Sequence, residues 1–434
     1  MDLAGTESSS DSDDFQILDH NFAHVLQFLH PENDETEEAT IPSESTFDLA
    51  LPTTHSYLGN NLKELRGRTL LDDGIHRNLP LLVKHSIILF PGQTLPMKSE
   101  SIEVIRMLQN CIQKDRIFGV ICVNNGKMVH VGTTAEVYEY YDGDLMAGSF
   151  RLKAKGRQRF KILRVIMKDK IMFKHGYDMF SANVKILPEV TLNHPFSDYR
   201  LASLDHLRIQ STNQQELKQQ DFVEKVDSVI TPWPSWVYKQ YDPVRLSSKI
   251  RHHLQFLEKR GGNIPKDPIE LSFWVAQNVL VDDDERIDLL NYDCAIARLQ
   301  REIKFLIEDR SFVCIHCDNF IAHQSNMFPM STEGLQSTYC NGYGVIFETI
   351  TVYHAEGLKL NMDTSSTDYS WFPGYAWITA SCNNCYSHMG WKFTAVKNNL
   401  KPKAFWGLSR RALKNKTNKK ADDTTETDAN PIGN

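Results

Sequence analysis

The chain has 434 residues, a length that allows two or three domains, and its 41% hydrophobic and 24% charged residues are ordinary for a soluble globular protein. No stretch of about 18 apolar residues occurs, so we expect no membrane-spanning helix. The first residues are acidic, with no early Lys or Arg, and we expect neither a signal peptide nor a mitochondrial presequence. The 8 cysteines should therefore be reduced or bound to metal.

The two ends of the chain differ in charge. Residues 1–45 contain 12 Asp or Glu and no Lys or Arg, so we expect residues 1–50 to form a disordered acidic tail. Residues 397–420 carry nine Lys or Arg and no acid, and we expect a second disordered tail at 418–434. The basic run is compatible with a nuclear localisation patch or a nucleic-acid contact, and equally with a solvated tail. We do not expect nucleic acid to be a partner.

Between the tails, the spacing of apolar residues changes near residue 197. From about 79 to 190, short β-rich runs alternate with Gly-containing turns, which predicts a small barrel or curled sheet. The predicted strands are 86–90, 117–123, 134–141, 159–165 and 182–187, with one helix at 102–112. From about 197 to 308 the spacing is helical, and it predicts helices at 214–229, 243–259, 268–280 and 284–308.

Two CxxC pairs carry the strongest chemical signal. They are Cys314 with Cys317 and Cys382 with Cys385, and together they complete the four-cysteine set of a closed, structural zinc site. The 64 residues between the pairs exceed the spacing of a compact zinc ribbon, so we expect a small β domain between them. A thiol-redox pair and an iron–sulfur cluster are the rival interpretations.

Three tryptophans lie close together near the second cysteine pair. Trp371 and Trp377 bracket a Pro-Gly turn, and Trp391 follows, with Phe393 two residues further on. This group is either an ordinary β-domain core or the wall of a ligand pocket, and we favour the pocket. An aromatic cage suits a quaternary ammonium. It suits equally a flat neutral ring whose edge bonds to main-chain groups, and the residue types alone do not decide.

Sequence signals of catalysis are few. The chain contains no G-x4-G-K-[ST] loop and no H-E-x-x-H, G-x-S-x-G or G-x-G-x-x-G motif. We therefore expect a protein that is not an enzyme, with a thiol-redox enzyme as the weaker alternative.

Long segments from residue 53 to about 413, in the right order, resemble the cereblon family. They include Leu51-Pro-Thr-Thr-His-Ser-Tyr-Leu-Gly59, Gly67-Arg-Thr-Leu70, Phe90-Pro-Gly-Gln-Thr-Leu-Pro96, Gly156-Arg-Gln-Arg-Phe160 and Phe405-Trp-Gly-Leu408. The resemblance implies an α+β multidomain fold. A β-rich Lon N-terminal-like domain would span 79–310, with a helical bundle at about 197–308. A small zinc-bound all-β domain that binds thalidomide would follow at 309–417.

The resemblance also implies a function. Members of the family act as substrate receptors of a cullin-4 RING ubiquitin ligase, in the cytoplasm and nucleus, and direct protein ubiquitination and proteasomal degradation. The helical bundle would dock on damage-specific DNA-binding protein 1. Trp233 and Trp236 are the natural docking surface unless both lie in the bundle core. Proteolysis is not implied, because the Lon ATPase and peptidase domains are missing.

The resemblance assigns site residues as well. One structural Zn²⁺ would be held by Cys314, Cys317, Cys382 and Cys385. A tri-tryptophan pocket of Trp371, Trp377 and Trp391, with Phe393 at its floor, would bind a glutarimide or the C-terminal cyclic imide of a substrate. The imide edge would bond to main-chain groups of Tyr369 and Trp371, under a mobile hairpin that carries Asn341.

Four positions depart from the mammalian pattern, namely Tyr369, Thr379, Phe347 and Tyr343. We expect the imide pocket to persist and the set of drug-induced substrates to differ. The alternative function is a zinc-bound reader of methylated lysine or another cation. Asp368, the one acid adjacent to the tryptophans in sequence, favours that alternative weakly.

Overall fold

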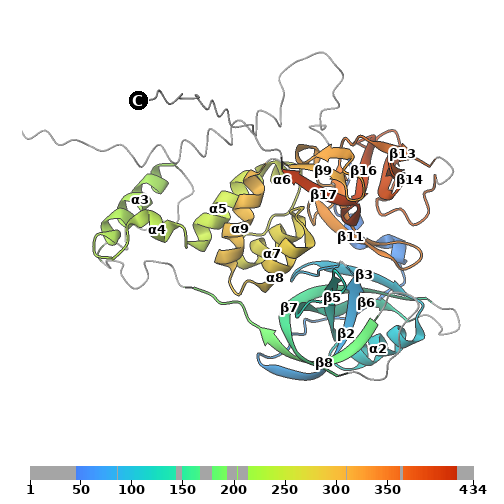
Figure 1. Ribbon diagram of the computed structural model, residues 1–434, viewed down its shortest axis with the longest axis horizontal. Helices are drawn as coiled ribbons and strands as arrows, with labels where there is room; N and C mark the ends of the chain where they lie inside the picture. The colour runs from blue at the N-terminus through green and yellow to red at the C-terminus, as the bar shows by residue number, and fades with distance from the viewer. Residues whose placement is uncertain are drawn as a thin grey trace, which may run out of the picture.

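The computed structural model describes residues 45–417, apart from 86, 143–148, 167–177, 193–202, 204–213, 309 and 362–364. Figure 1 shows a β barrel, a group of helices beside it and a C-terminal β domain that lies against both. The predicted tails at 1–44 and 418–434 fall outside the described residues. Their expected disorder therefore stays a prediction.

Five long strands close the barrel, because β6 pairs with both β4 and β7 and so joins the two ends of the order β6-β4-β2-β8-β7. Only β2 and β4 run parallel among the pairs of this sheet. The strands are β1 (Lys63–Glu64), β2 (Ile75–His85), β3 (Thr94–Ser99), β4 (Ile117–Asn124), β5 (Lys127–Met128), β6 (Val131–Tyr141), β7 (Phe150–Ile166) and β8 (Asp178–Leu187).

One predicted strand of this region is wrong. Residues 87–90 are not part of a strand, and β2 ends before them at His85. They form a buried connection in which Ile87 and Leu89 enter the barrel core while Ile88 and Phe90 pack toward the helices. An apolar run that is buried on both sides looks like a strand in sequence, although no strand of the described residues pairs with it.

Helix α2 (Ile102–Gln113) lies where its apolar spacing predicted it. The Ser101 hydroxyl caps the first turn by accepting a hydrogen bond from the Val104 N–H. Val104, Ile105 and Leu108 are buried and pack into the barrel core. The amphipathic face thus covers one side of the barrel.

The second helical region contains α3 (Gln214–Ser228), α4 (Ser235–Lys239), α5 (Pro243–His253), α6 (Gln255–Lys259), α7 (Pro268–Asn278), α8 (Asp283–Asn291) and α9 (Ala295–Ile307). Asp242 caps α5, because its carboxylate accepts from the N–H groups of Val244 and Arg245. Across the described part of the chain, none of the helices combines the length and apolarity that a bilayer crossing needs.

Two predicted long helices are broken. The helix expected at 284–308 is interrupted between α8 and α9, where the Tyr292 carbonyl oxygen accepts from Nη1 of Arg159 at 2.6 Å and of Arg298 at 2.8 Å. Because these two guanidinium groups occupy the carbonyl oxygen, it is not available to accept the N–H of a following helical turn, and the helix ends here. The helix expected at 243–259 breaks at Leu254, between α5 and α6.

The C-terminal β domain consists of two sheets. A three-stranded sheet has the order β10-β9-β17 and a six-stranded sheet the order β11-β12-β16-β15-β14-β13. The strands are β9 (Arg310–Cys314), β10 (Phe320–His323), β11 (Gln336–Cys340), β12 (Ile346–Val352), β13 (Leu358–Leu360), β14 (Tyr375–Cys382), β15 (His388–Ala395), β16 (Ala404–Ser409) and β17 (Leu413–Thr417).

The N-terminal segment corrects part of one tail prediction. Residues 45–50, expected in the disordered tail, pack on the C-terminal β domain, and Phe47 and Leu49 are buried there. The Phe47 ring meets the Tyr375 ring edge-on, with centroids 5.3 Å apart. Two short 3-10 turns, η1 (Pro52–Thr54) and η2 (Ser56–Leu58), lead from this segment toward the barrel. The apolar residues within this segment anchor it despite the acidic sequence before it.

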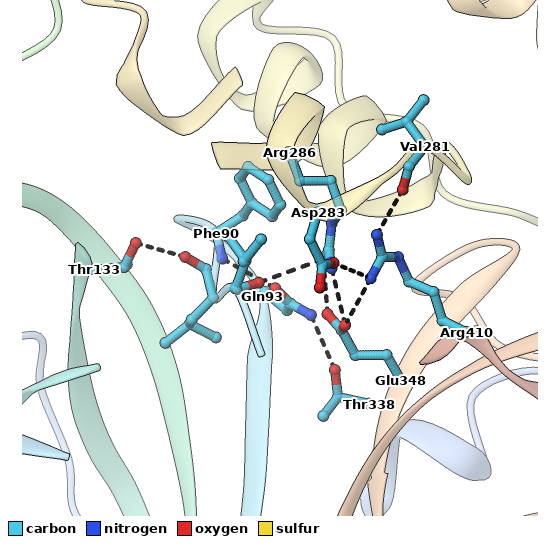
Figure 2. Close-up of polar contacts among 11 residues, drawn as sticks. Phe90, Gln93, Thr133, Val281, Asp283, Arg286, Thr338, Glu348 and Arg410 are labelled. Carbon is cyan, nitrogen blue, oxygen red and sulfur yellow. Dashed lines mark hydrogen bonds and ion pairs between the residues drawn. The ribbon is translucent and has the colours of Figure 1, made fainter. Parts of the chain in front are cut away.

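Buried polar contacts join the three parts of the structure (Figure 2). Arg286 of α8 donates two hydrogen bonds to the Glu348 carboxylate of β12, at 2.8 and 2.7 Å. Gln93, just before β3, donates through its side-chain amide to the Thr338 hydroxyl of β11 at 2.9 Å. The β11–β12 hairpin is therefore tied to both the helices and the barrel.

Candidate functional site

The four CxxC cysteines come from two similar turns. Cys314 ends β9 and Cys382 ends β14, and in each case the second cysteine follows in a tight turn. The N–H of the residue four positions after the first cysteine donates to that cysteine's carbonyl oxygen, at 3.0 Å in both turns. These residues, Asp318 and Tyr386, both have the left-handed conformation, with φ of 55° and 61°.

The sulfur atoms meet as the sequence predicts. All four lie within 4.8 Å of one another, with 3.5 Å between Cys314 and Cys385 and 3.6 Å between Cys317 and Cys382. A tetrahedral zinc with Zn–S bonds of about 2.3 Å needs sulfurs about 3.8 Å apart. The donor set therefore fits one structural Zn²⁺ and leaves no open coordination position.

The electrostatics around the cysteines differ between the two turns. Hydrogen bonds from the Ser387 hydroxyl and N–H lower the pKa of Cys385 to about 6. Burial raises the pKa of Cys314 to about 12. Because a zinc ligand must be a thiolate, the positive charge of the metal is what would hold all four sulfurs deprotonated.

The tryptophans form an aromatic site, defined here as Trp371, Trp377, Trp391 and Phe393. The Trp371 and Trp391 rings meet at 71° with centroids 4.6 Å apart. Trp371 also stacks on Tyr339 at 4.9 Å, and its indole N–H donates to the Cys340 carbonyl oxygen at 3.2 Å. Trp371 is therefore fixed in orientation by a ring on one side and a hydrogen bond on its edge.

Strand register places the remaining members on the same face. On β15, Trp391 and Phe393 are two residues apart, and Trp377 of β14 lies directly opposite Phe393. Phe393 is buried beneath the site and stacks on Phe405 at 5.1 Å. Trp377 is half-buried, and its indole N–H donates to the Asp368 carbonyl oxygen at 2.7 Å. Phe393 thus forms a floor and Trp377 a partly exposed edge.

A left-handed turn brings main-chain groups to this site. Tyr369 has a φ of 53°, a conformation that is costly for a bulky residue and is found mostly where function or packing demands it. The Ser370 hydroxyl closes the turn by donating to the Tyr375 carbonyl oxygen at 2.7 Å. Among the described residues, none hydrogen-bonds to the Tyr369 carbonyl oxygen or the Trp371 N–H.

Asn341 stabilises the β11–β12 turn. Its side-chain oxygen accepts from the N–H groups of Tyr343 at 3.0 Å and Val345 at 2.9 Å. Tyr343 projects outward and is 90% exposed. The structure gives Asn341 a role within the hairpin, and its contact with a ligand stays a prediction.

Sequence reasoning missed part of the wall. Phe347 was identified only as a departure from the mammalian pattern, but its ring meets the Trp391 ring edge-on with centroids 4.9 Å apart. Tyr339 and His388, which packs on Trp391 at 4.8 Å, were not predicted to belong to the wall. Burial lowers the pKa of His388. Tyr339 and Phe347 lie directly opposite each other on β11 and β12, and two aromatic residues on either side of a predicted hairpin turn were the available signal.

The helices carry an exposed apolar surface. Trp233 is 60% exposed and Trp236 59%, so the alternative in which both fill the bundle core is wrong. The docking surface, as we name it, comprises these two residues with Phe222, Val229, Ile230 and Val244, all of them exposed. Helices α3 and α4 contact each other, and exposed large apolar side chains on neighbouring elements are typical of an interaction site.

Two family models match the chain. Residues 78–308 match the ATP-dependent protease La (LON) substrate-binding domain. Residues 310–428 match the Yippee zinc-binding/DNA-binding and Mis18 family. A Lon N-terminal domain protein from Xanthomonas campestris is similar over 53% of this chain and 98% of its own, with 15% identity and a TM-score of 0.31.

Curated relatives cover nearly the whole chain. Protein cereblon of Xenopus tropicalis is 36% identical over 91% of this chain and 92% of its own length. Protein cereblon of Gallus gallus is 37% identical over 87% and 86%, and that of Danio rerio 35% identical over 92% and 94%. Together with the Lon-type domain and the zinc-type domain in the expected order, these similarities show that the chain belongs to the cereblon family.

Proposed function

We propose that the protein is a non-catalytic substrate receptor of a cullin-4 RING ubiquitin ligase, active in the cytoplasm and nucleus. Its aromatic site binds glutarimides and C-terminal cyclic imides of protein substrates, and its helices α3 to α5 dock on damage-specific DNA-binding protein 1. The observation that carries the proposal is the aromatic site itself. It combines the packed rings of Trp371 and Trp391 with main-chain groups of Tyr369 and Trp371 to which no described residue hydrogen-bonds.

The chemistry of a cyclic imide complements this arrangement. One edge of the imide presents an N–H flanked by two carbonyl oxygens, so it can donate to the Tyr369 carbonyl and accept from the Trp371 N–H. The ring methylenes are apolar and suit the faces of Trp377 and Trp391. Because two main-chain groups make these bonds, the departure of Tyr369 from the mammalian pattern leaves them available.

Such a receptor performs no bond-breaking step. It raises the effective concentration of substrate lysines beside the rest of the ligase, and the gain comes from tethering. The docking surface on α3 to α5 supplies the other end of the tether. Exposed tryptophans are frequent interface hot spots, which supports Trp233 and Trp236 as anchors for the adaptor.

A thermal-shift experiment on the full-length, zinc-loaded chain tests the imide site. A glutarimide at 100 times its Kd should stabilise the protein by about 2.7 kcal/mol, because it binds the native state alone. Trp377→Ala should abolish the shift, and Trp236→Ala, a matched change outside the aromatic site, should keep it. A trimethyl-lysine peptide run in parallel represents the cation-reader alternative.

A pulldown with damage-specific DNA-binding protein 1 tests the other surface. The double variant Trp233→Ala/Trp236→Ala should lose adaptor binding while Trp377→Ala retains it. A shift with trimethyl-lysine and none with glutarimide would replace the proposal with a cation reader. Adaptor binding that is unaffected by the double variant would reject the docking surface.

A further inference from the structure

A cavity of about 150 Å³ lies where three parts of the structure meet. Tyr57 of η2 lines it from the N-terminal segment, Lys98 and Arg151 from barrel strands β3 and β7, and Asn341 and Tyr369 from the C-terminal β domain. These last two residues connect it to the aromatic site. Tyr369 precedes Trp371 by two residues, and Asn341 directly follows Cys340, whose carbonyl oxygen accepts the Trp371 indole N–H.

The cavity is positively charged on its barrel side. Lys98 Nζ donates to the Gly342 carbonyl oxygen at 2.6 Å, which leaves further N–H groups of this ammonium available. Lys98 pairs with Glu100, whose carboxylate lies 3.3 Å from Lys98 Nζ and whose side chain is 66% exposed. A solvated carboxylate of this kind neutralises Lys98 only weakly.

Arg151 adds a second cation with an unused donor. Its guanidinium donates to the Leu58 carbonyl oxygen and to Asn61 Oδ1, and lies over the Tyr141 ring at 4.3 Å. Its Nε is buried and has no hydrogen-bond partner among the described residues. The buried Nε does not face the cavity, but the hydrogen bonds to Leu58 and Asn61 occupy only two of the five guanidinium N–H groups, which leaves donors on Nη1 and Nη2 for an acceptor.

We propose that this cavity is a carboxylate subsite of the aromatic site, and that it binds an acidic side chain immediately preceding a C-terminal cyclic imide. The inference rests on the proposed function, because the imide places the rest of the substrate at the mouth of the cavity. Lys98 and Arg151 supply charge-assisted hydrogen bonds, which are about twice as strong as neutral ones. The subsite would make the receptor selective among cyclic-imide substrates.

Paired peptides test the subsite on the full-length, zinc-loaded protein. The two peptides end in the same cyclic imide and carry Glu or Gln immediately before it, and their affinities are measured by fluorescence polarisation. We expect the Glu peptide to bind about tenfold more tightly, which is the worth of one charge-assisted bond. The preference should shrink as salt is added.

For each variant, the quantity compared is the ratio of its affinities for the Glu and Gln peptides, because this ratio cancels any general effect on imide binding. Lys98→Gln should reduce the preference to about twofold, and Lys98→Arg, which keeps the charge, should retain it. Glu100→Gln should increase it by removing the competing carboxylate. Lys127→Gln, at an exposed position of the same barrel, should leave the ratio unchanged.

The outcomes separate the two proposals. Equal affinity for both peptides overturns the subsite and leaves the imide receptor standing. A Glu preference that survives Lys98→Gln/Arg151→Gln locates the selectivity elsewhere and also overturns the subsite. Failure of both peptides and of free glutarimide to bind rejects the proposed function, and the subsite falls with it.

Discussion

Glu348 is the buried carboxylate that holds the C-terminal β domain against α8. Its side chain is 1% exposed and that of Arg286 is 0% exposed, and two hydrogen bonds of 2.7 and 2.8 Å join them. Arg410 lies on the other side, 3.7 Å from Glu348 and 2.5 Å from Asp283 (Figure 2). The cluster thus balances two arginines with two carboxylates.

The change Glu348→Gln keeps the shape of the side chain and removes one negative charge. Burial alone would lower the pKa of Arg286, but the charge and hydrogen bonds of Glu348 outweigh it and raise that pKa. In the variant the Arg286 guanidinium keeps its proton, because arginine is not deprotonated in proteins, but it loses its main counterion. Breaking one partner of a buried ion pair costs about 3–5 kcal/mol. Two unit charges about 4 Å apart attract each other by about 4 kcal/mol at an effective dielectric constant of about 20, which agrees with that range.

Urea unfolding of the zinc-loaded chain, followed by circular dichroism, measures this cost. Glu285→Gln is the matched control, because Glu285 makes a bidentate pair with Arg301 whose side chains are 33% and 37% exposed. The control should cost at most about 1 kcal/mol. Arg286→Leu/Glu348→Leu should cost less than Glu348→Gln, since no charge is left without its partner. If Glu348→Gln costs no more than the control, the reasoning is refuted.

Three further predictions concern stability. Chelation of zinc, or Cys382→Ser, should unfold the C-terminal β domain, seen as loss of near-ultraviolet circular dichroism together with metal release, whereas Cys294→Ser should not. His55 is held neutral, because burial, with Lys153 and Lys155, lowers its pKa from 6.5 to about 3. Between these two pH values the imidazole is protonated in the unfolded state and neutral in the folded state, so stability is lost as pH falls from about 6.5 toward 3. In an acid titration of unfolding, His55→Phe should make that loss of stability shallower. Gly390→Ala should lower stability by about 1–3 kcal/mol in thermal melts, because φ is 146° and a Cβ would overlap the Gly407 carbonyl oxygen.

The cysteine site could be predicted because its chemistry is local. A CxxC turn brings two sulfurs to one side of an ion whatever the rest of the fold does, so two such turns suffice to predict a zinc site with four thiolate ligands. The helix at 102–112 was equally predictable, since its capping residue and apolar face both lie within 13 residues. Such signals need no knowledge of distant contacts.

Exposure of the helices could not be predicted in the same way. Trp233 and Trp236 have the composition of a core, and periodicity does not distinguish a face that packs on a neighbouring helix from one that meets solvent. The structure decides it, because the described residues leave both indoles more than half exposed. The break between α8 and α9 could not be predicted for a related reason. Arg159, which donates a hydrogen bond to the Tyr292 carbonyl oxygen, lies 133 residues away in sequence.

The polar contacts between the parts of the structure are the least predictable feature, and they position the proposed sites. Glu348 follows Phe347, which packs on Trp391, and Arg286 lies 62 residues earlier in sequence. Lys98 reaches Gly342 across 244 residues. In a single sequence these charged residues look like ordinary surface, because burial of a charge is revealed only by the partner that neutralises it. Their fixed placement keeps the β11–β12 hairpin beside the aromatic site, so the geometry of that site depends on the barrel and helices as well as on the zinc-bound domain.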